Sequence, residues 1–184
     1  MGVTPGFWAG KRVFVTGHTG FKGAWLSLWL SNLHAVVAGY ALRPSTDPSL
    51  FVAARVGECL ESREGDILDF QRMRTALREA APQIVLHLAA QALVRPSYQD
   101  PLATFSTNLM GTVHVLEACR AVPSVRAVVI VTSDKCFVAA ASGRCGERSR
   151  AGHGGVRHRL PQMRDWQRSC AASFLGIATE SNEA

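Results

Sequence analysis

The sequence lacks the features that would assign it to several large classes of protein. None of its apolar runs approaches the ~20 residues that cross a bilayer, and no apolar segment with a cleavage site follows Lys11 and Arg12, so we predict neither a membrane span nor an export signal. The five cysteines are scattered without a Cys-x-x-Cys pair, which is typical of reduced thiols in the cytoplasm rather than of a disulfide framework.

Residues that bind metals are also spread along the chain. His18, His34, His87 and His114 fall in separate predicted elements, and each is better explained as a core or surface histidine than as a ligand. We therefore predict no metal site.

Acidic residues are outnumbered by basic ones. The chain has 20 Lys and Arg residues against 14 Asp and Glu residues, which gives a formal net charge of +6. Residues 138–184 carry half of this excess, with 7 Arg against 4 acidic residues, although they are only about a quarter of the 184 residues. Residues 1–137 carry a lower density of positive charge, which is typical of a solvated surface that suits anionic ligands.

Residues 12–137 alternate between apolar strands and helices. Nearly continuous apolar strands separated by helices indicate a parallel sheet covered on both faces, so we predict an α/β, doubly wound, Rossmann-like sheet that is incomplete. The predicted strands are 12–16, 35–42, 59–66, 84–88 and 125–132, and the predicted helices are 21–33, 69–81 with Asp69 as N-cap, and 102–122, with one further helical turn near 50–56. The inner face of the first helix is expected to hold Trp25, Leu26, Leu28, Trp29, Leu30 and Leu33.

The alternating pattern stops after Phe137. Residues 138–159 are rich in Ala, Gly, Ser and Arg, residues 160–175 could form a helix, and no strand is predicted in this part. We therefore divide the chain into a nucleotide-binding Rossmann-like domain at 1–137 and an irregular tail at 138–184. Without later strands, we expect the fifth strand or its neighbour to leave an unpaired edge of the sheet.

Three glycines follow the first predicted strand and open the first helix. Gly17, Gly20 and Gly23 let the backbone approach a ligand closely, and the free N–H groups of the first helical turn attract negative charge, as a dinucleotide diphosphate site requires. The alternative is a glycine-rich turn that binds nothing. The residues expected at the cofactor in this turn are Gly17, Thr19, Gly20, Phe21, Lys22 and Gly23.

The second predicted strand ends without the acid that usually holds the adenosine ribose. Arg43 stands there instead, and it either meets a 2′-phosphate or is simply solvated. The choice between NAD and NADP is therefore open on physical grounds.

The ends of the third and fourth predicted strands carry further cofactor candidates. Asp66 either accepts from the adenine amino group, with Ile67 as an apolar lid, or caps the next element. Small residues after the fourth strand let the backbone pass close to a cofactor at the carboxyl edge of the sheet. These residues are Leu88, Ala89, Ala90 and Gln91.

Ser133, Asp134 and Lys135 emerge together after the fifth predicted strand. A hydroxyl, a carboxyl and an amine side by side can move protons, although a polar loop with an ion pair explains them equally well. Asn108 and Gly111 lie inside the long predicted helix, which each of them weakens. They indicate a functional or packing role there, with tolerated irregularity as the alternative.

Together these segments resemble the extended short-chain dehydrogenase/reductase family, most closely the CDP-glucose branch of its sugar-nucleotide 4,6-dehydratases. Thr16 to Gly23 matches the family's Thr-Gly-x-x-Gly-Phe-x-Gly turn. Further matches follow in the family's order, and the resemblance covers about residues 6–137. They lie at 48–51, 65–67, 88–98, 108–112 and 132–136.

The resemblance implies an NAD-dependent lyase that acts on a nucleotide sugar. In such enzymes a hydride leaves C4 of the glucosyl unit, water leaves C5 and C6, and the hydride returns to C6. By position Ser133 would assist the C4 oxidation, Asp134 would protonate the departing hydroxyl, Lys135 would take the C5 proton, and Asn108 would lie near the active site. The product would be a precursor of dideoxy sugars in surface polysaccharide, and the intact enzymes can be homodimers.

The chain departs from this family in one respect. The family's Tyr-x-x-x-Lys pair is missing, because the only tyrosines are Tyr40 and Tyr98 and no lysine follows Lys135. Our hypothesis is that residues 138–184 are a shifted reading frame, with a divergent natural tail as the rival, and we expect no turnover from this chain alone.

Two other functions are compatible with the sequence. One is that of a non-catalytic nucleotide-binding module, and the other is that of a polyanion binder that uses its Arg-rich tail. Against the second, that tail has only Trp166 and Phe174 as aromatic residues, so we expect no nucleic-acid partner.

Overall fold

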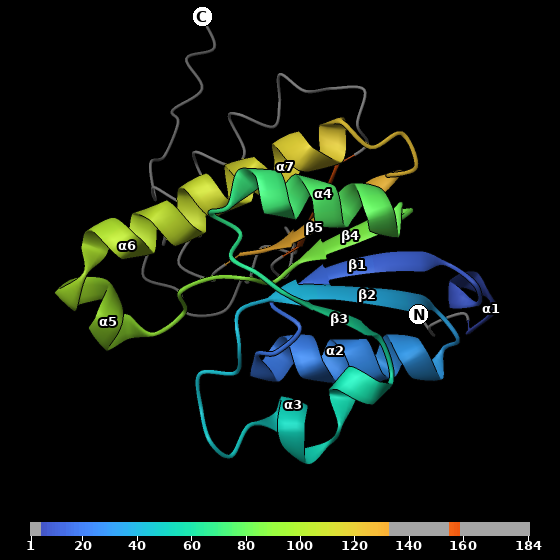
Figure 1. The fold of residues 1–184 in the computed structure, drawn as a ribbon, viewed down its shortest axis with the longest axis horizontal. Coiled ribbons are helices and arrows are strands. Elements are labelled where there is room, and N and C mark those ends of the chain that lie inside the picture. Colours follow the sequence, from blue (N-terminus) through green and yellow to red (C-terminus); the bar gives the residue numbers. More distant parts are fainter. Residues whose placement is uncertain (1–4, 133–154, 159–184) are drawn as a thin grey trace, which may run out of the picture.

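The computed structural model describes residues 5–132 and 155–158, which form one open sheet with helices on both faces (Figure 1). The strands are β1 (Arg12–Thr16), β2 (Val36–Ala41), β3 (Glu61–Glu64), β4 (Ile84–His87), β5 (Ala127–Val131) and β6 (Gly155–His158). The helices are α1 (Pro5–Trp8), α2 (Phe21–Asn32), α3 (Leu50–Ala53), the 3₁₀ turn η1 (Val56–Glu58), α4 (Phe70–Ala80), α5 (Val94–Gln99), α6 (Pro101–Phe105), the π-helical segment η2 (Ser106–Met110) and α7 (Gly111–Arg120).

The sheet has the doubly wound order β3-β2-β1-β4-β5-β6. Strands β1 to β5 are parallel, and the chain reverses its direction of travel between β1 and β4. This confirms the predicted Rossmann-like sheet. In such sheets ligands bind outside the carboxyl ends of the strands at the reversal, which here are Thr16 and His87.

The last strand differs from the expectation of an irregular tail. Residues Gly155–His158 form β6, which pairs antiparallel with β5, so that β5 is not the edge of the sheet. A strand can pair with the edge of a sheet through its backbone N–H and C=O groups without an apolar side-chain pattern. The side-chain periodicity of the sequence therefore did not predict β6. The edges of the described sheet are β3 and β6.

Each face of the sheet packs its own apolar cluster. Figure 1 shows α2 and α3 below the sheet and α4 and α7 above it, with α6 at the left. On the side of α4 and α7, Phe14 stacks on Tyr40 with their ring centroids 6.2 Å apart, and both side chains are fully buried. On the side of α2, Leu30 packs with Val13 and Val15. Both faces of β1 are thus covered, as its uninterrupted apolar sequence requires.

Helix α2 turns a different face to the sheet from the one expected. Its buried residues are Gly23, Ala24, Ser27 and Leu30, whereas Trp25 and Trp29 are 55% and 46% exposed. Leu30 is the only one of the six predicted inner residues that is buried. Small side chains let the start of the helix lie close to the turn below it, and this requirement outweighs the preference of the tryptophans for burial.

The long predicted helix is interrupted rather than regular. It consists of α6, the π-helical η2 and α7, and the unpredicted α5 precedes it. Asn108 lies inside η2 and Gly111 begins α7, so the two residues that looked out of place mark the π-helical segment. None of the helices within the described ranges is both long enough and apolar enough to span a membrane.

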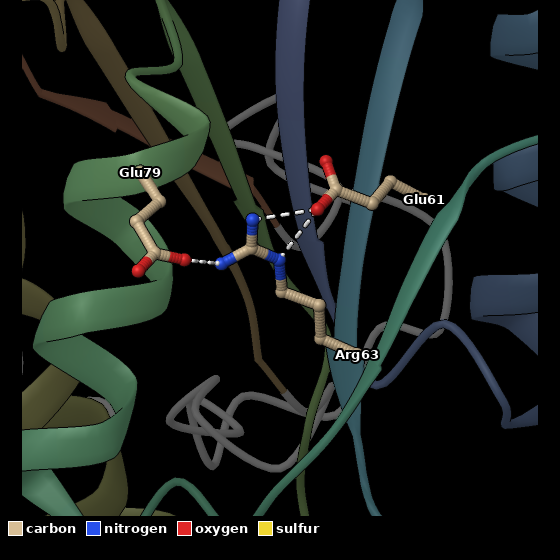
Figure 2. Close-up of polar contacts among 3 residues, drawn as sticks. All are labelled: Glu61, Arg63 and Glu79. Carbon is tan, nitrogen blue, oxygen red and sulfur yellow. Dashed lines mark hydrogen bonds and ion pairs between the residues drawn. The ribbon is translucent and has the colours of Figure 1, made fainter.

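The charged edge strand β3 is joined to α4 by ion pairs. Arg63 donates to Glu61 on its own strand and to Glu79 on α4, as Figure 2 shows. Asp69 accepts from the Arg72 N–H at 3.1 Å and caps α4, which confirms the predicted N-cap. Charges along an exposed edge discourage pairing with another chain.

A steric prediction follows from the turn after β3. A Cβ on Gly65 would lie 2.3 Å from the buried ring of Tyr40, although the backbone there allows any residue. We expect Gly65→Ala to lower the free energy of unfolding by roughly 1–3 kcal/mol through overpacking, measured by urea denaturation. Gly6→Ala is the control because nothing lies within 4 Å of its Cβ position. Equal stability of the two variants would contradict the packing described here.

Candidate functional site

The glycine turn runs from β1 into α2 against the backbone that follows β4. Gly17 has a φ of 75°, and its N–H donates to the Tyr40 carbonyl at 2.9 Å. A Cβ on Gly17 would lie 2.7 Å from the Ala89 nitrogen, and one on Gly23 would lie 2.0 Å from the Gly17 carbonyl oxygen. The structure therefore needs both glycines to bring three backbone segments together, in the strand–turn–helix context that the sequence predicted.

The first turn of α2 is free for an anion. Gly20 occupies the N-cap position with extended backbone, and its lack of a side chain leaves the helix start without a side-chain cap. No acidic residue stands in that turn, and Phe21 and Lys22 are exposed. A glycine-lined helix N-terminus presents N–H groups and the positive end of the helix dipole, which suits a diphosphate.

Side chains of the turn attach it to β2 and β3. The Thr19 hydroxyl donates to the Leu42 carbonyl at 2.8 Å, and His18 Nε2 lies 2.8 Å from Ser62 Oγ. Burial lowers the pKa of His18 to about 4, although the Tyr40 backbone partly opposes this shift. His18 is thus a buried core histidine, one of the two places expected for it, and its Nδ1 has no hydrogen-bond partner among the described residues. It also braces the glycine turn, which the sequence did not reveal.

A buried hydrogen-bond chain joins the carboxyl ends of β1 and β4 to α7. His87 Nδ1 lies 2.6 Å from Thr16 Oγ1, and His87 Nε2 lies 2.9 Å from Thr112 Oγ1. The Thr112 hydroxyl donates to the Asn108 carbonyl at 2.7 Å, so it must accept from His87 Nε2–H. Nδ1 then accepts from the Thr16 hydroxyl. The chain of donors holds His87 as a neutral ring, and burial lowers its pKa to about 4.

The same chain fixes the loop after β4. Thr16 Oγ1 accepts from the N–H groups of Leu88 and Ala89, each at 3.2 Å. Asn108 pairs with the backbone of Gln91: its Oδ1 accepts from the Gln91 N–H at 2.8 Å and its Nδ2 donates to the Gln91 carbonyl at 3.0 Å. The predicted cofactor segment from Leu88 through Ala90 to Gln91 is therefore held at both ends.

The remaining candidates fall at the same edge or outside it. Asp66 Oδ1 accepts from the Leu68 N–H at 2.9 Å, which favours the local capping role for that oxygen. Ile67 is only 4% exposed and contacts the position where Gly111 lacks a side chain, so this glycine serves packing against Ile67. Arg43 pairs with Glu64.

The predicted proton-transfer group lies outside the described residues. Ser133, Asp134 and Lys135 follow the end of β5 at Val131, and their roles stay predictions. The described hollow of about 640 Å³ between β3 and α4, lined by Tyr40, Arg63 and Glu79 among others, includes no residue of the glycine turn. Glu64, the last residue of β3, also lines this hollow.

A parallel sheet with a glycine turn and an uncapped helix start at its reversal point defines a protein with a Rossmann-like fold of the kind that binds nucleotides. Residues 14–149 match the GDP-mannose 4,6-dehydratase family. The chain belongs to that family, and the resemblance inferred from its motifs is confirmed.

Two relatives illustrate the range of sequences it resembles. CDP-glucose 4,6-dehydratase of Salmonella typhimurium is 56% identical over 135 residues, which cover 73% of this chain and 38% of that protein. UDP-glucuronate 4-epimerase 1 of Arabidopsis thaliana is 36% identical over 134 residues, covering 70% of this chain and 31% of that protein. The chain thus spans less than two fifths of the length of these curated relatives.

Solved structures with the same fold include NAD complexes. UDP-glucose 4-epimerase of Brucella ovis in complex with NAD is 26% identical, with a TM-score of 0.65, and the match covers 91% of this chain and 49% of that one. UDP-glucose-4-epimerase of Stenotrophomonas maltophila, with bound NAD and formylated UDP-arabinopyranose, is 26% identical with a TM-score of 0.63, covering 74% and 40%.

The neutral state of His87 predicts a pH dependence of stability. An unfolded histidine takes up a proton near pH 6.5, whereas folded His87 does so only near 4. Its contribution is complete above pH 6.5 and is lost as the pH falls toward 4, by roughly 1 kcal/mol per pH unit. We expect the free energy of unfolding, measured by urea denaturation at several pH values between 7 and 4.5, to fall less steeply with decreasing pH for His87→Gln than for the unsubstituted chain. Identical slopes would contradict the assignment.

Proposed function

We propose that the glycine turn and the start of α2 bind the diphosphate of NAD, and that the chain derives from a CDP-glucose 4,6-dehydratase. The proposal rests on the uncapped helix start joined to a turn in which a Cβ on Gly17 or Gly23 would strike backbone. The 56% identity with the Salmonella CDP-glucose 4,6-dehydratase supports the substrate class. Soluble, cytoplasmic synthesis of nucleotide sugars for surface polysaccharide is the setting that we propose.

The residues on the cofactor edge fit such a ligand. Backbone N–H groups of Phe21, Lys22 and Gly23 would hold the diphosphate, since no side chain intervenes there. Asp66 would border the adenine, whereas Ile67, expected as an apolar lid, is buried in the core against Gly111. The segment Leu88–Gln91, held by Thr16 and Asn108, would border the nicotinamide half. When bound, NAD would supply a hydride acceptor at C4 of the sugar and a hydride donor at C6.

The chemistry of protons falls to residues after β5. We propose that Ser133 assists oxidation at C4, that Asp134 protonates the departing C6 hydroxyl and that Lys135 removes the C5 proton, each by its position in the family motif. Asn108 is a positioning residue in this account. It acts on the site through the Gln91 backbone that it holds.

We further propose that this polypeptide alone is not a dehydratase. No tyrosine follows Tyr98 and no lysine follows Lys135, so the Tyr-x-x-x-Lys pair of the family is not supplied by these 184 residues. We attribute the Arg-rich composition of residues 138–184 to a shifted reading frame. Translation of the gene in its other two frames tests this directly: a Tyr-x-x-x-Lys motif in one of them supports the shift, and its absence from both excludes it.

The cofactor proposal predicts a sharp effect at Gly23. We expect isothermal titration of the purified chain to show NAD binding that Gly23→Ala weakens by at least about tenfold, because a methyl group there displaces the Gly17 carbonyl and the turn with it. Gly6→Ala is the control, and circular dichroism checks that both variants fold. Undiminished NAD binding by Gly23→Ala would refute the assigned cradle.

The activity proposal predicts binding without turnover. A missing proton-transfer residue removes a rate factor of typically ~10²–10⁴, so we expect no 4-keto product from CDP-glucose and NAD, measured by absorbance of the product in alkali. NAD binding without product identifies a nucleotide-binding module, the alternative considered above. Detectable product would show that residues 1–184 contain a complete catalytic set.

A further inference from the structure

The structure places an acidic residue of β3 beside the end of β2, which carries no acidic residue of its own. The segment after β2 continues with Leu42 and Arg43, and neither can accept a hydrogen bond from a ribose hydroxyl through its side chain. Glu64, the last residue of the neighbouring strand β3, pairs in register with Ala41 of β2. Because parallel strands end at the same edge of a sheet, Glu64 comes to the edge at which the glycine turn lies.

Arg43 and Glu64 form a hydrogen-bonded ion pair. Arg43 Nε donates to Glu64 Oε2 at 2.8 Å, with 82% and 54% of the two side chains exposed. One hydrogen bond links the glycine turn to the residue beside this pair: the Thr19 hydroxyl donates to the carbonyl of Leu42, which precedes Arg43. Arg43 is therefore a largely exposed residue whose guanidinium is paired with Glu64.

We propose that the Arg43–Glu64 pair selects the cofactor by its adenosine ribose: Glu64, held by Arg43, accepts from a 2′-hydroxyl and repels a 2′-phosphate. The proposal rests on the proposed cofactor site and adds to it the residues that discriminate NAD from NADP. Dinucleotide-binding sheets usually carry this acid at the end of β2, and here β3 would supply it instead. The role of Arg43 would be to hold that acid in place.

Charge decides which ligand the pair favours. Arg43 and Glu64 together are neutral, so a 2′-phosphate finds no net positive charge there and meets a carboxylate beside the guanidinium. A ribose 2′-hydroxyl can donate to a carboxylate, and hydrogen bonds to charged groups are stronger than those between neutral groups. Glu64→Gln leaves Arg43 with an unbalanced positive charge, which reverses the electrostatic preference.

The test is the ratio of the dissociation constants of NADP and NAD, measured by isothermal titration of the full 184-residue chain. We expect the unsubstituted chain to bind NAD more tightly than NADP. Glu64→Gln should tighten NADP binding and shift the ratio by about two- to fivefold toward NADP, the range expected for exposed charges. The shift should shrink as salt is raised, because the charges concerned are exposed.

A second exposed pair supplies the matched control. Arg55 Nε donates to Glu58 Oε1 at 2.7 Å with 75% and 60% of the side chains exposed, and η1 lies before β3, at the opposite end of that strand from Glu64. Glu58→Gln makes the same change of charge and should leave the ratio unchanged. A further variant, Arg43→Gln, removes the cation and leaves Glu64 to oppose the phosphate, so NADP binding should weaken more than NAD binding.

The outcomes separate this inference from the cofactor site itself. If the unsubstituted chain binds NAD and Glu64→Gln does not change the ratio, or if Glu58→Gln changes it equally, the pair is not the selecting element although the site stands. Preference of the unsubstituted chain for NADP would also overturn the inference. If neither nucleotide binds, the proposed function fails and the inference fails with it.

Discussion

The backbone of the glycine turn lies against the backbone that follows β4, and the candidate site depends on this close approach. At Gly17 the distance to Ala89 leaves no room for a Cβ, and at Gly23 the start of α2 rests on the Gly17 carbonyl. The contact brings a helix N-terminus without a side-chain cap to the reversal point of the sheet. This geometry supports the proposed diphosphate site, because the N-terminus of a helix attracts negative charge.

A second layer of hydrogen bonds keeps that edge in place. Thr16, His87 and Thr112 join β1, β4 and α7 through side chains that are at most 2% exposed, and Asn108 extends the connection to Gln91. Each donor in the chain has one available acceptor, so the order of the hydrogen bonds is determined. Removing one member would leave a buried polar atom unpaired, which typically costs about 1–3 kcal/mol. The π-helical segment η2 places Asn108 where it reaches the loop.

Local sequence signals predicted the sheet and the glycine turn but not every contact around them. Most strands were recognisable because they are apolar and bounded by turn residues, whereas β3 is charged. Asp69 marked the start of α4 by its capping chemistry. The burial of α2 was predicted wrongly because the close approach to the turn selects Gly23 and Ala24 over Trp25.

Contacts between distant parts of the chain could not be predicted in the same way. The pairing of β6 with β5 and of Glu64 with Arg43 depends on which strands the topology makes neighbours. The side-chain periodicity of the sequence does not specify those neighbours. His87 was expected to be a core or surface histidine and is a hydrogen-bonded core one, but its partners Thr16 and Thr112 lie 71 and 25 residues away. Only the three-dimensional arrangement reveals that they form one network.

The most direct test of the account is to map NAD onto the turn by ¹H–¹⁵N nuclear magnetic resonance. Addition of NAD to the labelled chain should shift the amide signals of Gly17, Gly20 and Gly23 together with those of Ala89 and Ala90. Shifts confined to other parts of the chain, or no shifts at millimolar NAD, would contradict the claim that this turn is a diphosphate site.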